Sequence, residues 1–285
     1  MTYQFIADQQ LTTPVKWMCR ALEVSESGFY AWRKRPPSNR DQEDSRLAEQ
    51  IKQVYQASRQ TYGSPRIQAE LRAQGHCCGR KRIARLMWQH GLSARRKHHR
   101  TCTTDSQHGL PVAPNRLNRA FKAERPNEKW VADITGIRTS QGWLYLAVVL
   151  DIFSRKVIGW AMAARREDDL VLAALRMALA QRHPQAGLLH HSDRGSQYTS
   201  SEYQTLLRDW GIEVSMSSKG DCYDNALMES FFATLKGECT DRQHWASHQQ
   251  ARQAIFEYLE VFYNRQRRHS SLKYLSPIAY ERLQA

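Results

Sequence analysis

Three acidic residues stand in sequence contexts where carboxylates are unusual. Asp193 lies in HHSDRGSQYTS, after two histidines and before an arginine and a glycine. Asp133 interrupts the otherwise apolar stretch WVADIT, and Glu229 stands among bulky apolar residues in ALMESFFATLK. An ionised carboxylate with apolar neighbours is costly unless it is paired, lies at a rim or binds a metal. These three acids are therefore candidates for a site with chemistry.

Carboxylate oxygens are the ligands that hard divalent cations such as Mg²⁺ and Mn²⁺ prefer. Two such ions can activate a water or hydroxyl and stabilise the leaving oxygen in phosphodiester chemistry. Each acid also has a structural explanation, as a salt-bridged core acid (Asp133), a turn residue (Asp193) or a solvated helix acid (Glu229). His190 and His191 cannot coordinate the same ion, because successive side chains of a strand point to opposite faces.

The residues from 129 onward predict a mixed α/β domain that could position these acids. β-Branched and aromatic runs mark strands, and amphipathic stretches mark helices. Asp133 then lies in the first strand and Asp193 at the end of the fourth, which can lie beside the first. In open α/β sheets reactive groups gather at this carboxyl end. We expect strands at 129–139, 142–154, 156–163, 187–193 and 212–217, and helices at 168–182, 200–211, 224–239 and roughly 247–264.

The first part of the chain is strongly basic and predicts helices. Residues 1–125 hold 23 lysines and arginines against 10 acids, whereas residues 126–285 hold 19 against 18. In a chain of net charge +14 this asymmetry suggests a polyanion-binding module joined to something else, although a basic solvated surface would also explain it. Two short helices across 13–35, the second capped by Ser25, fit a helix-turn-helix. A second helical unit spans about 44–92.

The composition favours a cytoplasmic protein. The longest apolar run, WLYLAVVL, is far shorter than the roughly 20 residues that a membrane span needs. The N-terminus carries no hydrophobic segment before a small-residue cleavage site. Six cysteines in 285 residues favour reduced thiols over a disulfide framework. A zinc site is not favoured, because Cys77 and Cys78 are adjacent and lack the usual ligand spacing.

Five motifs resemble those of insertion-sequence-three family transposases, in the second-reading-frame product (OrfB) with a retroviral-integrase-like core. The motifs are WVADIT, LDIFSRKVIGW, HSDRGSQYTS, SKGDCYDNALMESFFATLK and VFYNRQRRHSSLKYLSP, in order over roughly residues 120–280. Residues 44–92 also resemble the helix-turn-helix region that precedes this core. Thirty-five residues separate Asp193 from Glu229, which is the spacing expected of the family's Asp-Asp-Glu triad.

The resemblance implies a ribonuclease-H-like fold with Asp133, Asp193 and Glu229 as the catalytic ligands of Mg²⁺ or Mn²⁺, bound as two ions. It implies water-driven nicking at the ends of an element, then attack of the freed 3′-hydroxyl on another strand. The implied partners are transposon-end and target DNA, further copies of the chain on that DNA, and an upstream-frame DNA-binding product, fused or in complex. The chain would act in the bacterial cytoplasm, associated with the nucleoid when it is bound to DNA.

This organisation divides the chain into five expected segments. They are a helix-turn-helix-like segment (1–40), a helical DNA-binding domain (44–92), a basic linker (93–122), a ribonuclease-H-like catalytic core (123–240) and a C-terminal helical extension with a basic tail (241–285).

Several further residues are candidates for supporting roles. His191 shares the strand face of Asp193 and either orients substrate or is a packing histidine, and Asn225 is expected to support the site through a hydrogen bond. Asp151 has no metal role in the family pattern, and an ion pair with Arg155 is expected. Candidate phosphate contacts are Arg80, Lys81, Arg82, Arg85, Lys236, Arg265, Arg267 and Arg268, with a wet cationic helix face or a solvated tail as the alternatives.

Two other functions remain open at this point. A nuclease of the same fold would hydrolyse DNA without joining strands. A DNA-binding regulator would carry an inactive α/β domain, although the presence of all three acids gives that alternative little support.

Overall fold

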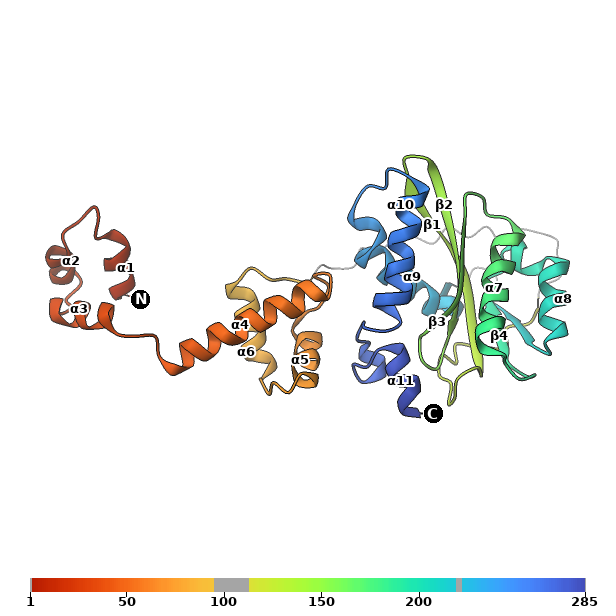
Figure 1. Ribbon diagram of the computed structural model, residues 1–285, viewed down its shortest axis with the longest axis horizontal. Coiled ribbons are helices and arrows are strands. Elements are labelled where there is room, and N and C mark those ends of the chain that lie inside the picture. The colour runs from red at the N-terminus through yellow and green to blue at the C-terminus, as the bar shows by residue number, and fades with distance from the viewer. Residues whose placement is uncertain (1, 95–112, 219–221, 285) are drawn as a thin grey trace.

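The computed structural model describes residues 2–94, 113–218 and 222–284. Most of the expected basic linker, residues 95–112, therefore lies outside the described residues. In Figure 1 the N-terminal helices lie at one end of the molecule and the sheet with its covering helices at the other.

A mixed five-stranded sheet forms the centre of the second half. Its strand order is β3-β2-β1-β4-β5, with β1–β2 and β2–β3 antiparallel and β1–β4 and β4–β5 parallel. The first and fourth strands are neighbours, as expected. The strands are β1 (Lys129–Thr139), β2 (Gly142–Asp151), β3 (Val157–Ala163), β4 (Leu189–Ser192) and β5 (Glu213–Met216).

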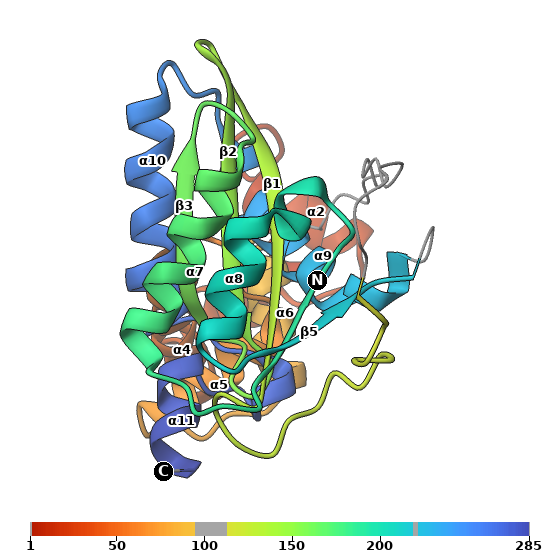
Figure 2. The ribbon, with the colours of Figure 1, turned by 90° about the vertical axis from the view of Figure 1, so that its right-hand side faces the viewer.

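Helices cover both faces of this sheet (Figures 1 and 2). Because side chains alternate along a strand, neighbouring residues of β1 enter different cores. Val131 packs in a cluster with α9 and α10, whereas Trp130 packs in a cluster with α7 and α8. These helices are α7 (Asp168–Arg182), α8 (Ser201–Asp209), α9 (Ala226–Glu238) and α10 (His248–Phe256).

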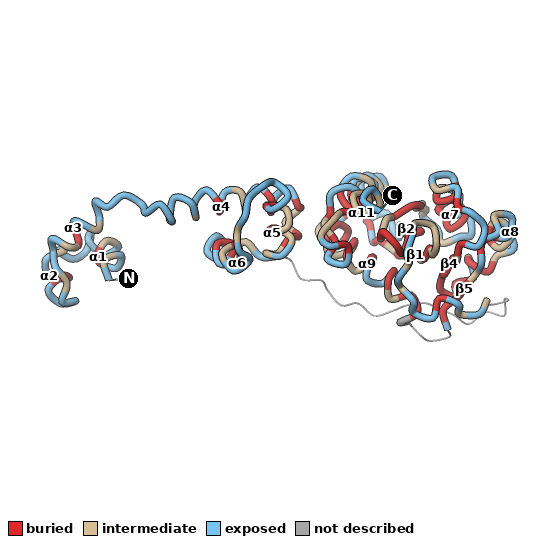
Figure 3. The backbone as a smooth tube through the Cα atoms, turned by 90° about the horizontal axis from the view of Figure 1, so that it is seen from below, coloured by how far each residue is buried: buried red, intermediate tan, exposed pale blue. Residues whose placement is uncertain are grey.

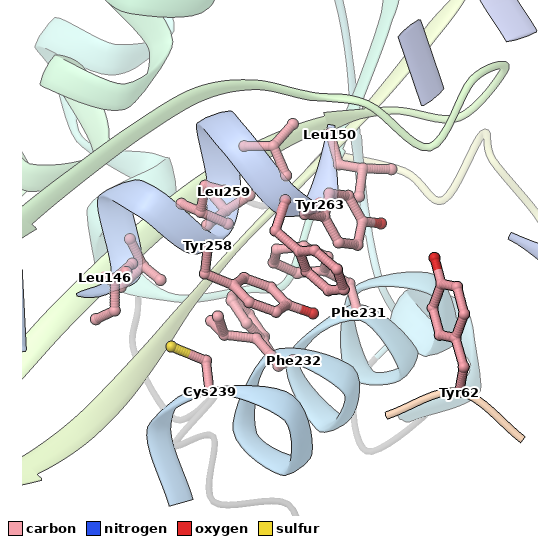
Figure 4. Close-up of a cluster of buried hydrophobic side chains, with 14 of the residues drawn as sticks. Tyr62, Leu146, Leu150, Phe231, Phe232, Cys239, Tyr258, Leu259 and Tyr263 are labelled. Carbon is pink, nitrogen blue, oxygen red and sulfur yellow. The ribbon is translucent and has the colours of Figure 1, made fainter. Parts of the chain in front are cut away.

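Aromatic side chains of α9 pack against those of the C-terminal helices (Figure 4). The expected helix at roughly 247–264 is α-helical through α10 and continues as the π-helix η4 (Glu257–Tyr263). Phe231 of α9 meets Tyr263 of η4 edge-on, with ring centroids 5.0 Å apart. Such edge-to-face pairs stabilise a core beyond the area that they bury. The last helix is α11 (Pro277–Gln284). Short 3₁₀ helices lie in the connections between the longer elements: η1 (Ser196–Thr199), η2 (Cys222–Asn225), η3 (Thr240–Arg242) and η5 (Ser270–Leu272).

The N-terminal region is entirely helical. Ser25 caps its third helix as expected, since its Oγ accepts the Gly28 N–H at 3.2 Å. The long helix α4 is exposed along its first half and buried only in its second half (Figure 3). The elements are α1 (Thr2–Gln9), α2 (Val15–Ala21), α3 (Glu26–Lys34), α4 (Asn39–Ala57), α5 (Ser64–Ala73) and α6 (Arg80–Gln89).

These elements confirm the predicted fold class, a mixed five-stranded sheet with flanking helices after an all-helical region. In the part of the chain that the structure describes, no helix has the length and apolar character needed to cross a membrane.

Candidate active site

The sheet register brings Asp133 next to Asp193. Strands β1 and β4 run parallel, and their last registered pair is Ala132 with Ser192. Asp133 and Asp193 are therefore the next residues on adjacent strands. Asp133 shares a face with Val131, which packs in the cluster that contains α9, so it lies on the face that α9 covers. Asp193 is buried and Asp133 is half-buried.

Glu229 belongs to the same electrostatic environment. It lies in the first turn of α9, on an exposed side. Burial raises the pKa of Asp133 well above its ordinary value, and the negative charges of Asp193 and, less strongly, Glu229 add to this rise. The Ile134 backbone N–H, which donates to Asp133 Oδ1 at 2.7 Å, and the Arg166 charge oppose it. Asp133 is thus repelled by both other acids.

A donor set of three carboxylates fits a hard divalent cation, which would offset this repulsion. Among residues 2–94, 113–218 and 222–284, however, no three His, Cys, Asp or Glu side chains form a group that could hold a metal ion. The structure therefore places Asp133 beside Asp193 on adjacent strands, without a formed group of three ligands among the described residues. Asn225, one turn before Glu229, adds a buried Oδ1 that accepts no hydrogen bond from the described residues.

The loop after β4 fixes the orientation of Asp193. Its Oδ1 accepts the Gly195 N–H at 2.9 Å. A Cβ at Gly195 would lie 3.0 Å from this oxygen and 3.6 Å from Arg166 Nη2. Glycine is therefore needed here for close approach of the two side chains rather than for an unusual backbone conformation.

Arg166 and Tyr198 are residues of this site that the sequence did not single out. Arg166 lies in the connection between β3 and α7, and its charge lowers the pKa of Asp133. The buried Tyr198 hydroxyl has no hydrogen-bond partner among the described residues, and its pKa is raised by burial and then by the charge of Asp133. The adjacent arginines Arg165 and Arg166 could have indicated a phosphate contact, but nothing in the sequence showed which of the two lies near the acids.

His191 is buried beside β5. Its two ring nitrogens lie 2.8 Å from Ser215 Oγ and 3.2 Å from Ser217 Oγ, both on the β5 side. The side chain is fully buried, and burial lowers its pKa to about 4. The imidazole is thus neutral and held between strands. This geometry favours the packing alternative over substrate orientation.

Asp151 is a structural acid, but its expected partner was wrong. Its carboxylate accepts the backbone N–H groups of Asn127 and Phe153, each at 2.8 Å, and lies 3.8 Å from Arg182 Nη2. Arg155 instead donates to the carbonyl of Phe121 at 3.2 Å. The cation near Asp151 therefore comes from α7, far away in the sequence.

Arg267 is not a phosphate contact in this structure, and that expectation is corrected. Only 3% of its surface is exposed, and its guanidinium donates to both carboxylate oxygens of Glu238 at 2.6 and 2.7 Å. Arg268 is also engaged, with Glu70 of α5 at 2.5 Å and the Tyr274 carbonyl at 2.9 Å. Arg265 is exposed, and its Nε donates to the Glu260 carbonyl at 3.0 Å.

On α6 the four basic candidates divide into two kinds. Arg80 and Lys81 are exposed at the start of the helix. Arg82 and Arg85 bind the Asp44 carboxylate at 2.6 and 2.5 Å, which offsets part of their charge. The face available to phosphates is thus less cationic than the sequence suggests. Lys236 lies two turns after Glu229 on α9 and lines a cleft beside the acids.

Comparison with known families matches the two halves of the chain separately. Two models, each described as "Integrase core domain", match residues 123–222 and 210–277, and a model described as "HTH-like domain" matches residues 42–100.

Curated relatives match nearly the whole chain. The transposase InsF for insertion sequence IS3A of Escherichia coli (strain K12) is 44% identical over 283 residues, covering 99% of this chain and 98% of that protein. An uncharacterized 31 kDa protein of insertion element IS600 from Shigella sonnei is 46% identical over 263 residues, covering 92% and 97%. Among solved structures, the HTLV-2 integrase catalytic core domain in complex with magnesium matches with 16% identity and a TM-score of 0.43, covering 56% of this chain and 99% of that one.

Proposed function

This chain belongs to the bacterial insertion-sequence transposases typified by InsF, and we propose that Asp133, Asp193 and Glu229 are its catalytic carboxylates. The observation that carries this proposal is the position of Asp133 and Asp193 directly after the last registered residue pair of β1 and β4, with the charge of Glu229 acting on Asp133. Burial of an acid next to two others is costly unless a cation is bound there.

The proposed cofactor is Mg²⁺ or Mn²⁺, as two ions held by these carboxylates. When bound, such ions activate the attacking oxygen and stabilise the leaving oxygen of a phosphodiester. The Gly195 N–H orients Asp193, and Arg166 supplies positive charge where the phosphate would lie beside the acids. The same site would serve both steps, first with water and then with a freed 3′-hydroxyl as the attacking group.

We further propose that the helices at 44–92 hold duplex DNA and present it to the core at 123–240. Exposed Arg80 and Lys81 would contact phosphates, whose neutralisation supplies most of the sequence-independent affinity for DNA. Assembly with further copies on DNA, and with an upstream-frame product, belongs to this proposal as well.

A strand-transfer assay tests the catalytic assignment. The full chain is incubated with a labelled duplex carrying one end of its element, a plasmid target and Mg²⁺ or Mn²⁺, beside the Asp133→Asn variant. We expect nicking and joining by the wild type, and loss of both with duplex binding retained by Asp133→Asn. Hydrolysis without joining would favour the nuclease alternative, and unchanged products from Asp133→Asn would overturn the assignment.

A further inference from the structure

A cleft of about 830 Å³ opens beside the acids. One side comes from the β1–β2 hairpin and the other from the end of α9 and the η3 region. Its lining residues are Ile134, Thr135, Gly136, Ile137, Arg138, Trp143, Tyr145, Arg166, Lys236, Thr240, Asp241, Gln243 and His244.

The cleft follows a free edge of the sheet. Strand β4 pairs only with residues 129–132 of β1, whereas β2 pairs with β1 up to Thr139. The hairpin therefore extends beyond the rest of the sheet (Figure 2), and among the described residues no strand pairs with the second edge of β1 after Ala132. The lining begins at Ile134, directly after Asp133, so the cleft leads away from the candidate catalytic acids.

One wall of the cleft is aromatic. Gly136 pairs across the strands with Tyr145, and the next residue on that face, Arg138, pairs with Trp143. This is the face that α7 and α8 cover, opposite to that of Asp133, so the cleft extends around the free edge of β1. A Cβ at Gly136 would lie 3.0 Å from the Trp143 ring and 3.7 Å from the Tyr145 ring, so the missing side chain lets both rings lie against β1. Trp143 remains 51% exposed, which leaves ring surface open to a ligand.

The charged residues of the lining are mainly cationic. Arg138, Arg166 and Lys236 line the cleft, against one acid, Asp241. Arg166 also lies close to Asp193, because the position of a Gly195 Cβ is within 3.6 Å of Arg166 Nη2 and 3.0 Å of Asp193 Oδ1. Arg166 therefore connects the surroundings of Asp193 with the cleft.

The two walls are tied together at the hairpin turn. Ser140 Oγ lies 2.7 Å from His244 Nε2, and the Ser140 N–H donates to the Trp245 carbonyl at 2.9 Å. Trp245 is itself buried in the core. These bonds hold the aromatic wall at a fixed place, so a ligand would meet a preformed surface.

We propose that this cleft binds unpaired DNA next to the catalytic acids, with bases stacked on Trp143 and Tyr145 and phosphates held by Arg138, Arg166 and Lys236. Aromatic rings stack on exposed base faces, which are hidden inside a duplex, and cationic grooves follow the backbone. The cleft volume lies in the range of pockets that hold small molecules, roughly 300–1,000 Å³. It therefore suits a few nucleotides of an opened strand rather than a double helix. The inference rests on the proposed DNA function and specifies its substrate as an end that is locally unpaired.

A binding experiment without metal tests this proposal separately from catalysis. The full chain is titrated into two fluorescent duplexes with the same element end, one fully paired and one with three mismatched terminal base pairs. Since one stacked base contributes roughly a ten-fold gain in affinity, we expect about ten-fold tighter binding of the mismatched end. Trp143→Ala should lose this preference, and Trp143→Phe should keep most of it.

Phe256→Ala is the matched control, since Phe256 is 50% exposed on α10 and does not line the cleft. Circular dichroism checks that all variants are folded. Equal affinity of the wild type for both ends, or equal preferences in Trp143→Ala and Phe256→Ala, would overturn the proposal. Asp133→Asn should retain the preference, so a failure of the catalytic assignment in the strand-transfer assay is distinguishable from a failure of the cleft assignment.

Discussion

At the scale of single residues, the candidate site depends on short contacts around Asp193. Asp193 follows the last residue of β4, and the Gly195 N–H orients its carboxylate. Arg166 Nη2 lies close to both residues. Catalytic groups that are displaced by even about 1 Å lose on the order of 100-fold in rate. A small side chain at Gly195 therefore tests the orientation of Asp193 without removing any functional group.

We predict that Gly195→Ala lowers strand transfer by about 3- to 10-fold, because the new methyl group would lie 3.0 Å from Asp193 Oδ1 and shift the carboxylate by less than about 1 Å. Gln185→Ala is the control, since Gln185 is exposed in the connection between α7 and β4, outside the proposed catalytic and DNA-binding residues. Strand-transfer rates and thermal unfolding midpoints are compared for both variants. Wild-type rates in Gly195→Ala would show that this contact does not orient the carboxylate.

Among the secondary-structure elements, the C-terminal extension binds the end of α9 through a buried ion pair between Arg267 and Glu238. Arg267 donates two hydrogen bonds to Glu238, the last residue of α9, and Tyr258 of η4 donates a third at 2.8 Å. Burial would raise the pKa of Glu238, but these hydrogen bonds and the Arg267 charge outweigh it and lower the pKa. The pair therefore stabilises the fold above about pH 4, the unfolded pKa of glutamate, and this contribution is lost as the pH falls through the lower folded pKa.

We predict that Arg267→Ala lowers the free energy of unfolding at pH 7 by about 3–5 kcal/mol, because the buried Glu238 carboxylate loses two charge-assisted hydrogen bonds and, among the described residues, keeps only Arg66, 3.8 Å away, as a nearby cation. Arg265→Ala, two residues earlier and exposed, should change it by no more than about 0.5 kcal/mol. Urea unfolding of both variants measures the difference. A small effect of Arg267→Ala would mean that Arg267 is free to act elsewhere, as the sequence had suggested.

The elements were more predictable than the side-chain partners. The first strand and the helix at 168–182 have the predicted bounds, because each is a clear periodic run between turn residues. The sequence could not reveal that Arg267 is buried or that Arg182 rather than Arg155 lies near Asp151, because such pairs depend on tertiary packing between distant segments. The site acids could be predicted from their apolar surroundings and the family motifs, whereas Arg166 required the loop geometry.

At the scale of the whole molecule, the helices α4–α6 rest against the C-terminal extension. Tyr62, before α5, accepts the Arg268 backbone N–H at 2.7 Å, and Glu70 of α5 pairs with the Arg268 guanidinium. Arg66 of α5 lies 3.8 Å from Glu238. The proposed duplex-binding helices thus contact the same residues that hold α9 and its Glu229, which gives them a defined position relative to the candidate active site.

We predict that Glu70→Arg weakens the attachment of α4–α6 to the core, because two arginines would then face each other at residues 70 and 268, while the contacts of Tyr62 and Arg66 remain. Small-angle X-ray scattering should show an increase in the radius of gyration, while far-ultraviolet circular dichroism stays unchanged. Glu49→Arg is the control, because the Glu49 side chain is exposed on α4, and it should leave the radius as in the wild type. An unchanged radius in Glu70→Arg would show that this ion pair does not hold the two parts together.

Manganese binding by the full chain on an element-end duplex tests the central claim most directly, measured by the electron paramagnetic resonance of free Mn²⁺. We predict saturable binding in the wild type, strong weakening in each of Asp133→Asn, Asp193→Asn and Glu229→Gln, and unchanged binding in Asp241→Asn, which removes an exposed acid of the adjoining cleft. Wild-type Mn²⁺ affinity in all three acid variants would contradict the existence of a shared metal site.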